Sequence, residues 1–261
     1  MKTAPRHRVT ERPYKIMFNH QKINSHNIKI YQNKNLIKKI YENYYKIIKK
    51  YIYKRDPYKI LELGSGGGNI KNIIRECITS DQFKNNKVDR IENIYKINFK
   101  NNTLSNIILI DVFHHLRFPS LALKEINRVL VKGGRVIMLE PAMGLVPRII
   151  YKIFHYEPNG FNLKINWNKI PKKIPTSNQY FAAQSLPWRA FFLKEYNLKD
   201  KYKIRLVKPF SDFALLLSGG YSYNAFYPIL LYPLIKSIDI ALTYISIRIF
   251  SARMLIVLEK K

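Results

Sequence analysis

In the middle of this chain, apolar runs alternate with glycine-rich or polar segments. Short runs of the length of buried strands occupy residues 59–63, 78–80, 106–112 and 135–139. Residues 69–77 and 120–130 have helical spacing, and Gly133-Gly134 ends the second of these segments. Strands that alternate with helices are typical of a parallel sheet covered on both faces, so the sequence predicts an α/β fold.

The flanking segments have other patterns. Residues 1–32 are polar and basic with few apolar anchors, which predicts a loosely ordered N-terminal arm. Residues 36–53 place isoleucines and tyrosines on one helical face. This predicts a packed helix with solvated lysines; a membrane-surface or nucleic-acid face is the alternative. After Pro141, residues 142–180 are irregular and rich in proline, and residues 210–233 are aromatic and loop-like.

The C-terminal third mixes helix and strand patterns. We expect a helix near 188–196 and strands at 202–207 and 253–259. Residues 234–250 are apolar almost all round, and their one narrow polar stripe consists of Lys236, Asp239, Thr243 and Ser246. The stretch is too short and too charged for a membrane span, which leaves a buried helix, a lid helix or a helix inserted in a membrane interface.

The amino-acid composition limits the number of domains, the disulfides and the compartment that the protein can have. The 261 residues are 47% hydrophobic, which suits one folded domain rather than a disordered chain. A single cysteine, Cys77, excludes an internal disulfide and a cysteine-rich zinc site, and we expect it in the core. One cysteine suits a reducing compartment, and no apolar run typical of a signal peptide follows the basic start. We therefore expect a cytoplasmic protein.

The net charge of +29 is extreme and uneven. Residues 1–58 (15 basic, 3 acidic) and 141–261 (18 basic, 6 acidic) each carry +12 of it. Such an excess favours an anionic partner, either RNA or an anionic membrane surface. Codon bias is the alternative, because the abundant residues Lys, Asn, Ile, Tyr and Phe all have AT-rich codons.

The glycines after the first strand form the most informative motif. They stand as Glu62-x-Gly64-x-Gly66-x-Gly68, directly after an apolar strand and before a segment of helical spacing. Glycines at such a turn adopt positive φ and let a ligand approach the backbone closely. A dinucleotide fingerprint would need glycine at Asn69, and a phosphate loop would need Lys-Ser or Lys-Thr, so neither pattern applies.

With three further segments, this motif resembles the class I S-adenosylmethionine-dependent methyltransferases over residues 59–141. The further segments are Asp81 after the second strand, Ile110–Leu116 at the fourth and Glu125–Gly134 before the fifth. The resemblance implies a doubly wound, Rossmann-like sheet of seven mostly parallel strands with helices on both faces. It also implies an antiparallel last hairpin, insertions after strands 5 and 6, and S-adenosyl-L-methionine as cofactor.

The same resemblance implies which residues hold the cofactor. They are Glu62, Gly64, Ser65, Gly66, Gly68, Asp81, Asn93 and Asp111. Asp81 would hold the ribose hydroxyls. Asn93 departs from the family, which usually has an acid after the third strand to accept from the adenine amino group. An amide oxygen can accept the same bond, and Asp89 and Glu92 lie close in the sequence.

Candidate residues on the acceptor side follow the fourth and fifth strands. His114 and His115 come where the fourth strand ends, so each could be a general base or position the acceptor, with packing of the loop as the alternative. His155, Glu157 and Trp188 are candidates for substrate contact, with plain surface or core positions as the alternative. They lie in segments that resemble a bacterial subgroup of methyltransferases. No spacing of His, Cys or Asp suggests a metal site.

We therefore expect one methyltransferase domain over residues 33–261, with a cofactor-binding core at 59–141 and acceptor-side caps at 142–180 and 210–250. The apolar caps favour a small-molecule, lipid-linked or glycan-linked acceptor for an enzyme that is cytoplasmic or peripheral on the inner face of the membrane. An RNA methyltransferase is the alternative that the charge favours. A scaffold that binds the cofactor without catalysis is the third hypothesis.

Overall fold

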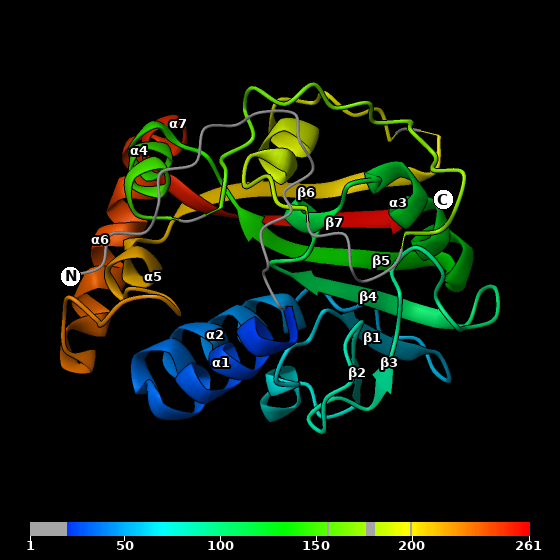
Figure 1. Cartoon of the computed structure of the whole chain (residues 1–261), viewed down its shortest axis with the longest axis horizontal. Coiled ribbons are helices and arrows are strands. Elements are labelled where there is room, and N and C mark those ends of the chain that lie inside the picture. The colour runs from blue at the N-terminus through cyan, green and yellow to red at the C-terminus, as the bar shows by residue number, and fades with distance from the viewer. Residues whose placement is uncertain (1–19, 156, 176–180, 199) are drawn as a thin grey trace.

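A computed structural model describes residues 20–155, 157–175, 181–198 and 200–261. Seven strands form one sheet in the order β3-β2-β1-β4-β5-β7-β6 (Figure 1). The strands are β1 (Lys59–Leu63), β2 (Cys77–Asp81), β3 (Arg90–Ile91), β4 (Leu104–Ile110), β5 (Leu130–Pro141), β6 (Tyr202–Ser211) and β7 (Ser251–Lys260). β7 is antiparallel to β5 and β6, and the other neighbours are parallel. The predicted doubly wound sheet with an antiparallel last hairpin is confirmed.

Helices cover both faces of this sheet. They are α1 (His20–Asn33), α2 (Asn35–Lys49), α3 (Pro119–Val129), α4 (Leu145–Phe154), α5 (Phe213–Leu217), α6 (Tyr232–Ile245) and α7 (Ile247–Phe250). Neighbouring residues of β4 pack on opposite sides, Ile108 in the cluster that contains α2 and Ile107 in the cluster that contains α3. A strand covered on both faces is apolar at successive positions, which explains the apolar run Ile107–Ile110 in β4.

Two predictions near the N-terminus were wrong. Residues 69–77 hold only a short 3₁₀ helix, η1 (Asn69–Asn72). Ile70 and Ile74 pack in one cluster with α2, which covers the face where a longer helix would lie. The arm expected at 1–32 is helical from His20 onward, and residues 1–19 lie outside the described part of the chain.

Both predicted insertions are present. α4 and a largely irregular stretch follow β5, and α5, a 3₁₀ turn (η4, Ile229–Leu231), α6 and α7 connect β6 to β7. The helix expected near 188–196 is a short π-helix, η3 (Trp188–Phe192). Among the helices that the structure describes, none has the length and apolar character needed to cross a membrane.

α6 is turned with its polar side toward the protein. Asp239, only 1% exposed, accepts hydrogen bonds from Ser211 Oγ (2.9 Å) and from the backbone N–H groups of Phe213 (2.6 Å) and Ala214 (3.2 Å). These N–H groups begin α5 and have no partner within that helix. Tyr244, on the other side of α6, is 87% exposed. α6 is therefore not the buried helix that was one expectation, because its apolar residues face outward.

Replacing Asp239 by alanine should lower the free energy of unfolding by about 2–4 kcal/mol, because three buried donors lose their acceptor. Tyr244→Ala removes more atoms from the exposed side and should cost less than about 0.5 kcal/mol. Urea unfolding followed by circular dichroism measures both variants. Equal losses, or a larger loss for Tyr244→Ala, would contradict this orientation of α6.

Candidate active site

The glycine motif forms the turn after β1, beside the carboxyl ends of β2 and β4. A Cβ at Gly64 (φ +73°) would overlap the side chain of Val112, and one at Gly68 (φ +67°) would overlap the carbonyl of Lys87. Both positions therefore need glycine for conformation and for space. Ser65 holds the turn against β2, since its N–H and Oγ both bond to the backbone there, at 2.8 and 3.1 Å.

Glu62, on β1, brings a buried carboxylate to this turn. No described residue gives its Oε2 a hydrogen bond. Burial raises the pKa of Glu62 from 4.5 to about 7. A buried oxygen without a partner is costly, and a ligand with a cationic amino group would pair with it. The residues present therefore fit the S-adenosylmethionine that the motif implies.

Asp81 is the last residue of β2, and its carboxylate contacts the glycine turn. The N–H groups of Gly66 and Phe83 donate to its two oxygens at 3.0 and 3.1 Å. Burial raises the pKa of Asp81, and these bonds oppose that rise. The structure thus brings Glu62, Ser65, Gly66 and Asp81 together along one cavity wall.

Asn93 lies apart from this wall. Its Oδ1 accepts the N–H of Tyr95 at 2.9 Å, and its amide donates to the carbonyl of Pro175 at 3.0 Å. Among the described residues, Asn93 does not line the cavity, whereas its neighbour Glu92 does. Glu92 is buried and ion-paired with Arg90 at 2.6 Å.

Asp111 ends β4 in a left-handed conformation (φ +56°) and lines the cavity. Its carboxylate is ion-paired with the buried guanidinium of Arg253 on β7 and accepts a hydrogen bond from Tyr41 Oη at 3.3 Å. Burial would raise the pKa of Asp111, but Arg253 holds it below its ordinary value. Neither partner was apparent from the sequence, because Tyr41 lies on an apolar helical face and Arg253 stands next to the long apolar run of its strand.

Glu140, at the end of β5, organises the turn that follows β4. Its Oε1 accepts the N–H groups of Val112 (2.9 Å) and Phe113 (2.7 Å), and its Oε2 lies 2.8 Å from Nδ1 of His114. The carboxylate thereby caps a short 3₁₀ helix, η2 (Phe113–His115), whose first N–H groups have no helical partner. Glu140 was not among the residues predicted from the sequence, although an acid at the end of an apolar strand is a signal for such a role.

His114 is buried between two carboxylates. Its Nδ1 faces Glu140, and its Nε2 lies 3.7 Å from Glu157 Oε2. Burial alone would lower the pKa of this ring, but Glu140 and Glu157 raise it to about 10. His114 is therefore an imidazolium at neutral pH.

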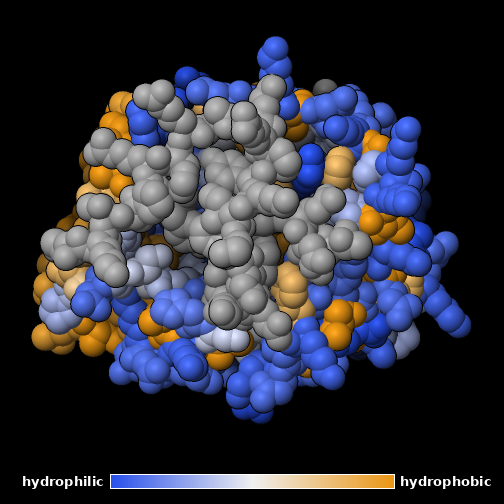
Figure 2. Space-filling view, viewed as in Figure 1, coloured by the Kyte–Doolittle hydropathy of each residue, from blue (hydrophilic) through white to orange (hydrophobic). Residues whose placement is uncertain are grey.

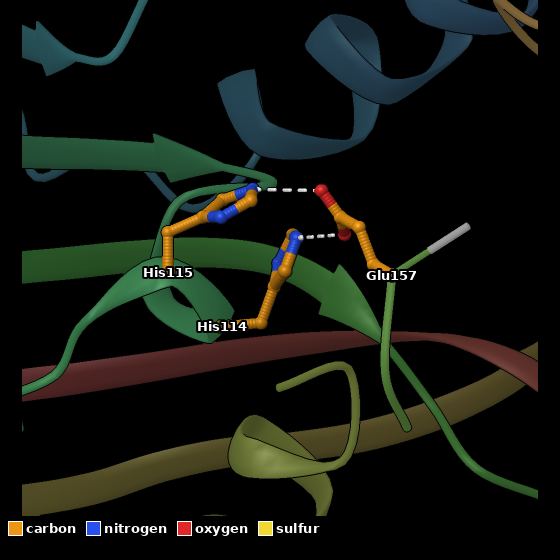
Figure 3. Close-up of side chains that lie close together, drawn as sticks. All are labelled: His114, His115 and Glu157. Atoms are coloured by element: carbon orange, nitrogen blue, oxygen red, sulfur yellow. Dashed lines mark ion pairs between the residues drawn. The ribbon is translucent and has the colours of Figure 1, made fainter. Parts of the chain in front are cut away.

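His115 lines the cavity from the same turn, with its side chain 32% exposed. Its Nδ1 lies 3.0 Å from the carbonyl oxygen of Phe181, which can only accept, so Nδ1 carries the proton of the neutral ring. Nε2 then has the lone pair, 3.8 Å from Glu157 Oε1 (Figure 3). Burial and the charge on His114 lower the pKa of His115 below 6.5. This lowered pKa favours the neutral form of the ring at pH 7.

The segment after α4 supplies the carboxylate that faces both histidines (Figure 3). Glu157 is buried and hydrogen-bonded to Gln184; burial would raise its pKa, but His115 and His114 hold it well below the usual range. His155 lines the same cavity, and its Nδ1 accepts the N–H of Glu157 at 3.2 Å. Trp188 lies elsewhere, in the core, with its ring stacked on Phe192 at 4.0 Å.

One cavity of about 1150 Å³ joins these groups. It runs from the glycine turn past both histidines to α4, α5 and the segment 219–226, and α1 closes part of it. Pockets for one small ligand commonly measure roughly 300–1,000 Å³, so this cavity has room for a cofactor and a second molecule.

Two groups of three side chains at or near the cavity could also hold a divalent cation. Ligand atoms of His114, His115 and Glu157 lie within 4.8 Å of one another, and so do those of Asp111, His114 and Glu140. A protonated His114 has no lone pair to give, so its charge pairing and metal binding exclude each other. A metal-free site remains our prediction.

Comparison with known proteins agrees with this geometry. Residues 61–138 match a family model described as a methyltransferase domain. A SAM-dependent methyltransferase of Thermotoga maritima, described as a possible histamine N-methyltransferase, is 14% identical over 92% of this chain and 97% of its own, with a TM-score of 0.53. The comparison with curated proteins gives no match.

Two further solved structures are less similar. The geranyl diphosphate C-methyltransferase of Streptomyces coelicolor is 13% identical over 86% of this chain and 81% of its own, with a TM-score of 0.48. A complex of the Haloferax volcanii Trm112 activator with a protein provisionally described as a methyltransferase is 9% identical over 93% and 97%, with a TM-score of 0.49. Residues 61–138 are therefore identified as a methyltransferase domain, and the fold around them is shared with a SAM-dependent methyltransferase.

The pKa of Glu62 gives this site a pH signature. S-Adenosylhomocysteine should bind more weakly as pH falls below about 7, because a protonated Glu62 cannot pair with the ligand's amino group. Binding near pH 7 should also release a proton. Calorimetric titration in two buffers of different ionisation enthalpy measures both effects.

Glu62→Gln should weaken binding and remove this pH dependence. Glu76→Gln, which changes an exposed acid before β2, is the matched control and should leave both unchanged. The same pH dependence in Glu62→Gln as in the wild type would show that Glu62 is not the responsible group.

Proposed function

We propose that the protein transfers the methyl group of S-adenosylmethionine to a hydroxyl group of an apolar small molecule or lipid-linked acceptor. The observation that carries this proposal is one continuous cavity that is lined by the polar glycine turn, by the imidazole of His115 and by an apolar region. The apolar region is lined by Ile150, Tyr151, Phe154, Leu215, Leu216, Leu217 and Phe226.

The polar part of the cavity suits the cofactor. When bound, S-adenosylmethionine supplies a methyl group on a positively charged sulfur. Glu62 would hold the amino group, because its buried oxygen otherwise lacks a partner. Asp81 would hold the ribose hydroxyls from the edge of the glycine turn, as the family resemblance implies. Glu92, which lines the cavity where Asn93 does not, is our candidate for the adenine amino group.

His115 would accept the proton that a hydroxyl acceptor loses. Phe181 fixes the tautomer that leaves Nε2 as acceptor, and the charged His114 keeps the ring neutral until it takes that proton. Glu157 would stabilise the imidazolium that forms, since its Oε1 lies 3.8 Å from Nε2. His114 and Glu140 act through His115 and the turn, so we regard them as positioning residues.

The acceptor class is testable by transfer of a labelled methyl group. We expect label in material extracted into organic solvent when the enzyme is given lipid and glycolipid extracts. Label in RNA instead would favour the alternative that the net charge of +29 suggests. Binding of S-adenosylhomocysteine without transfer to either pool would contradict the proposed acceptor class and favour the scaffold that binds the cofactor without catalysis. No binding at all would contradict the proposed function.

The role of His115 makes a kinetic prediction. His115→Gln should lower kcat by about 10²–10⁴-fold and leave S-adenosylhomocysteine affinity unchanged, because only the proton acceptor is lost. His155→Gln is the control; it should raise KM more than it lowers kcat, since His155 lines the cavity without that role. An equal loss of kcat in both variants would contradict this assignment.

The pH profile separates a base from a packing residue. With S-adenosylmethionine saturating, so that Glu62 stays ionised in the complex, kcat/KM for the acceptor should rise with pH in the wild type, and the midpoint of this limb should lie below the ordinary histidine value of 6.5. His114→Gln removes the neighbouring positive charge, so the pKa of His115 should increase and the limb should move to higher pH. An unmoved limb in His114→Gln would mean that the titrating group is not His115.

A further inference from the structure

The outer face of α4, α6 and α7 is apolar and exposed. It consists of Leu145, Ile149, Ile153, Leu234, Ile238, Tyr244, Ile245 and Ile249, together with Leu230 on the 3₁₀ turn before α6, and we call it the α4–α6–α7 face. Leu230 is 84% exposed, Ile245 69% and Ile153 66%. Helices of soluble domains usually turn such residues inward, and contiguous exposed apolar patches mark interaction surfaces.

The three helices lie together in the fold. α7 packs against both α4 and α6. Figure 1 shows the three at one end of the molecule, beyond the last hairpin, and Figure 2 shows apolar side chains gathered along that side. The residues on α4 and many of those on α6 recur every three or four positions, so each helix presents a stripe to one side.

α6 cannot rotate to hide its stripe, because its polar side is bound to the protein. Asp239 caps α5, and Lys236 Nζ lies 3.3 Å from both Asp239 Oδ2 and Asp212 Oδ1. Both carboxylates are buried. The outward apolar stripe is therefore built into the fold.

We propose that the α4–α6–α7 face binds the surface of an anionic phospholipid bilayer. The exposed charges on these helices are basic: Arg148 and Lys152 on α4 and Arg248 on α7. The one acid within the three helices, Asp239, is buried. An apolar face flanked by Lys and Arg is typical of helices that lie in a membrane interface.

The residue types favour a bilayer over a protein partner. Strong protein contacts concentrate in Trp, Tyr and Arg, whereas leucine is under-represented there. The α4–α6–α7 face consists mainly of leucine and isoleucine, whose burial in lipid needs no matched partner surface.

The same face adjoins the opening of the cavity. Phe154, Leu217 and Phe226 line the cavity and are also exposed to solvent. Docking would therefore place the apolar part of the cavity next to the lipid. The docking proposal does not depend on the acceptor, because binding to vesicles can be measured without methyl transfer.

Vesicle co-sedimentation of the full chain tests the proposal. Vesicles of phosphatidylcholine alone are compared with an equal mixture of phosphatidylcholine and phosphatidylglycerol. We expect strong binding to the mixed vesicles and weaker binding to the neutral ones. Failure to bind the mixed vesicles would overturn the proposal, as would equal binding to both.

Two double variants separate the apolar and basic contributions. Ile153→Asn with Ile245→Asn should weaken binding at least tenfold, because both side chains leave the α4–α6–α7 face. Each basic residue near an anionic surface strengthens binding by about fivefold. The double variant Lys152→Gln with Arg248→Gln should therefore weaken vesicle binding by about 25-fold.

The matched control changes exposed isoleucines outside this face. Ile91 lies on β3, at the opposite edge of the sheet, and Ile170 lies in the segment after α4; both are exposed. Ile91→Asn with Ile170→Asn should bind vesicles as the wild type does. S-Adenosylhomocysteine binding by each variant shows that it is folded.

Wild-type binding by the Ile153→Asn, Ile245→Asn variant would overturn the proposal and point to the basic N-terminal segment. Self-association of the wild type that this variant abolishes, without vesicle binding, would assign the face to a second copy of the chain instead.

Discussion

The carboxylate of Glu140 fixes the arrangement on which the rest of the site depends. It joins the ends of β5 and β4 by accepting two backbone N–H groups and the Nδ1 proton of His114. A buried carboxylate is stable only when its hydrogen bonds and charge are matched, and here His114 supplies the charge. The turn Val112–His115 therefore has one conformation and one distribution of protons.

The charge of His114 then decides what its neighbours can do. It favours the ionised form of Glu157 and disfavours protonation of His115. Two adjacent histidines thus acquire opposite states, one charged and structural, the other neutral and facing the cavity. Such a division arises when environments push neighbouring pKa values apart.

The far end of the chain supports the same site. Arg253 on β7 holds Asp111 beside the glycine turn, so the antiparallel last hairpin contributes to the cavity as well as to the sheet. The connection between β6 and β7 completes the apolar wall. Residues far apart in sequence therefore build the acceptor side.

Local patterns predicted six of the seven strands and the glycine turn, because an apolar run or a glycine motif reports its own conformation. The seventh strand and the two insertions were implied by the family resemblance. They did not predict what depends on distant contacts. Residues 69–77 have helical spacing, but only a short 3₁₀ helix forms there, and Ile70 and Ile74 pack in one cluster with α2. The spacing of 234–250 shows where its polar stripe lies, and only the donors around Asp239 reveal that this stripe faces inward. Glu140 and Arg253 escaped notice for the same reason.

The most direct test of this account is a nuclear magnetic resonance titration of the histidine ring nitrogens in ¹⁵N-labelled protein. At about pH 8, between the ordinary 6.5 and the raised value of about 10, His114 should be protonated on both nitrogens. His115 should then be neutral with its proton on Nδ1. A neutral His114 at that pH, or a proton on Nε2 of His115, would contradict the division of roles between the two histidines.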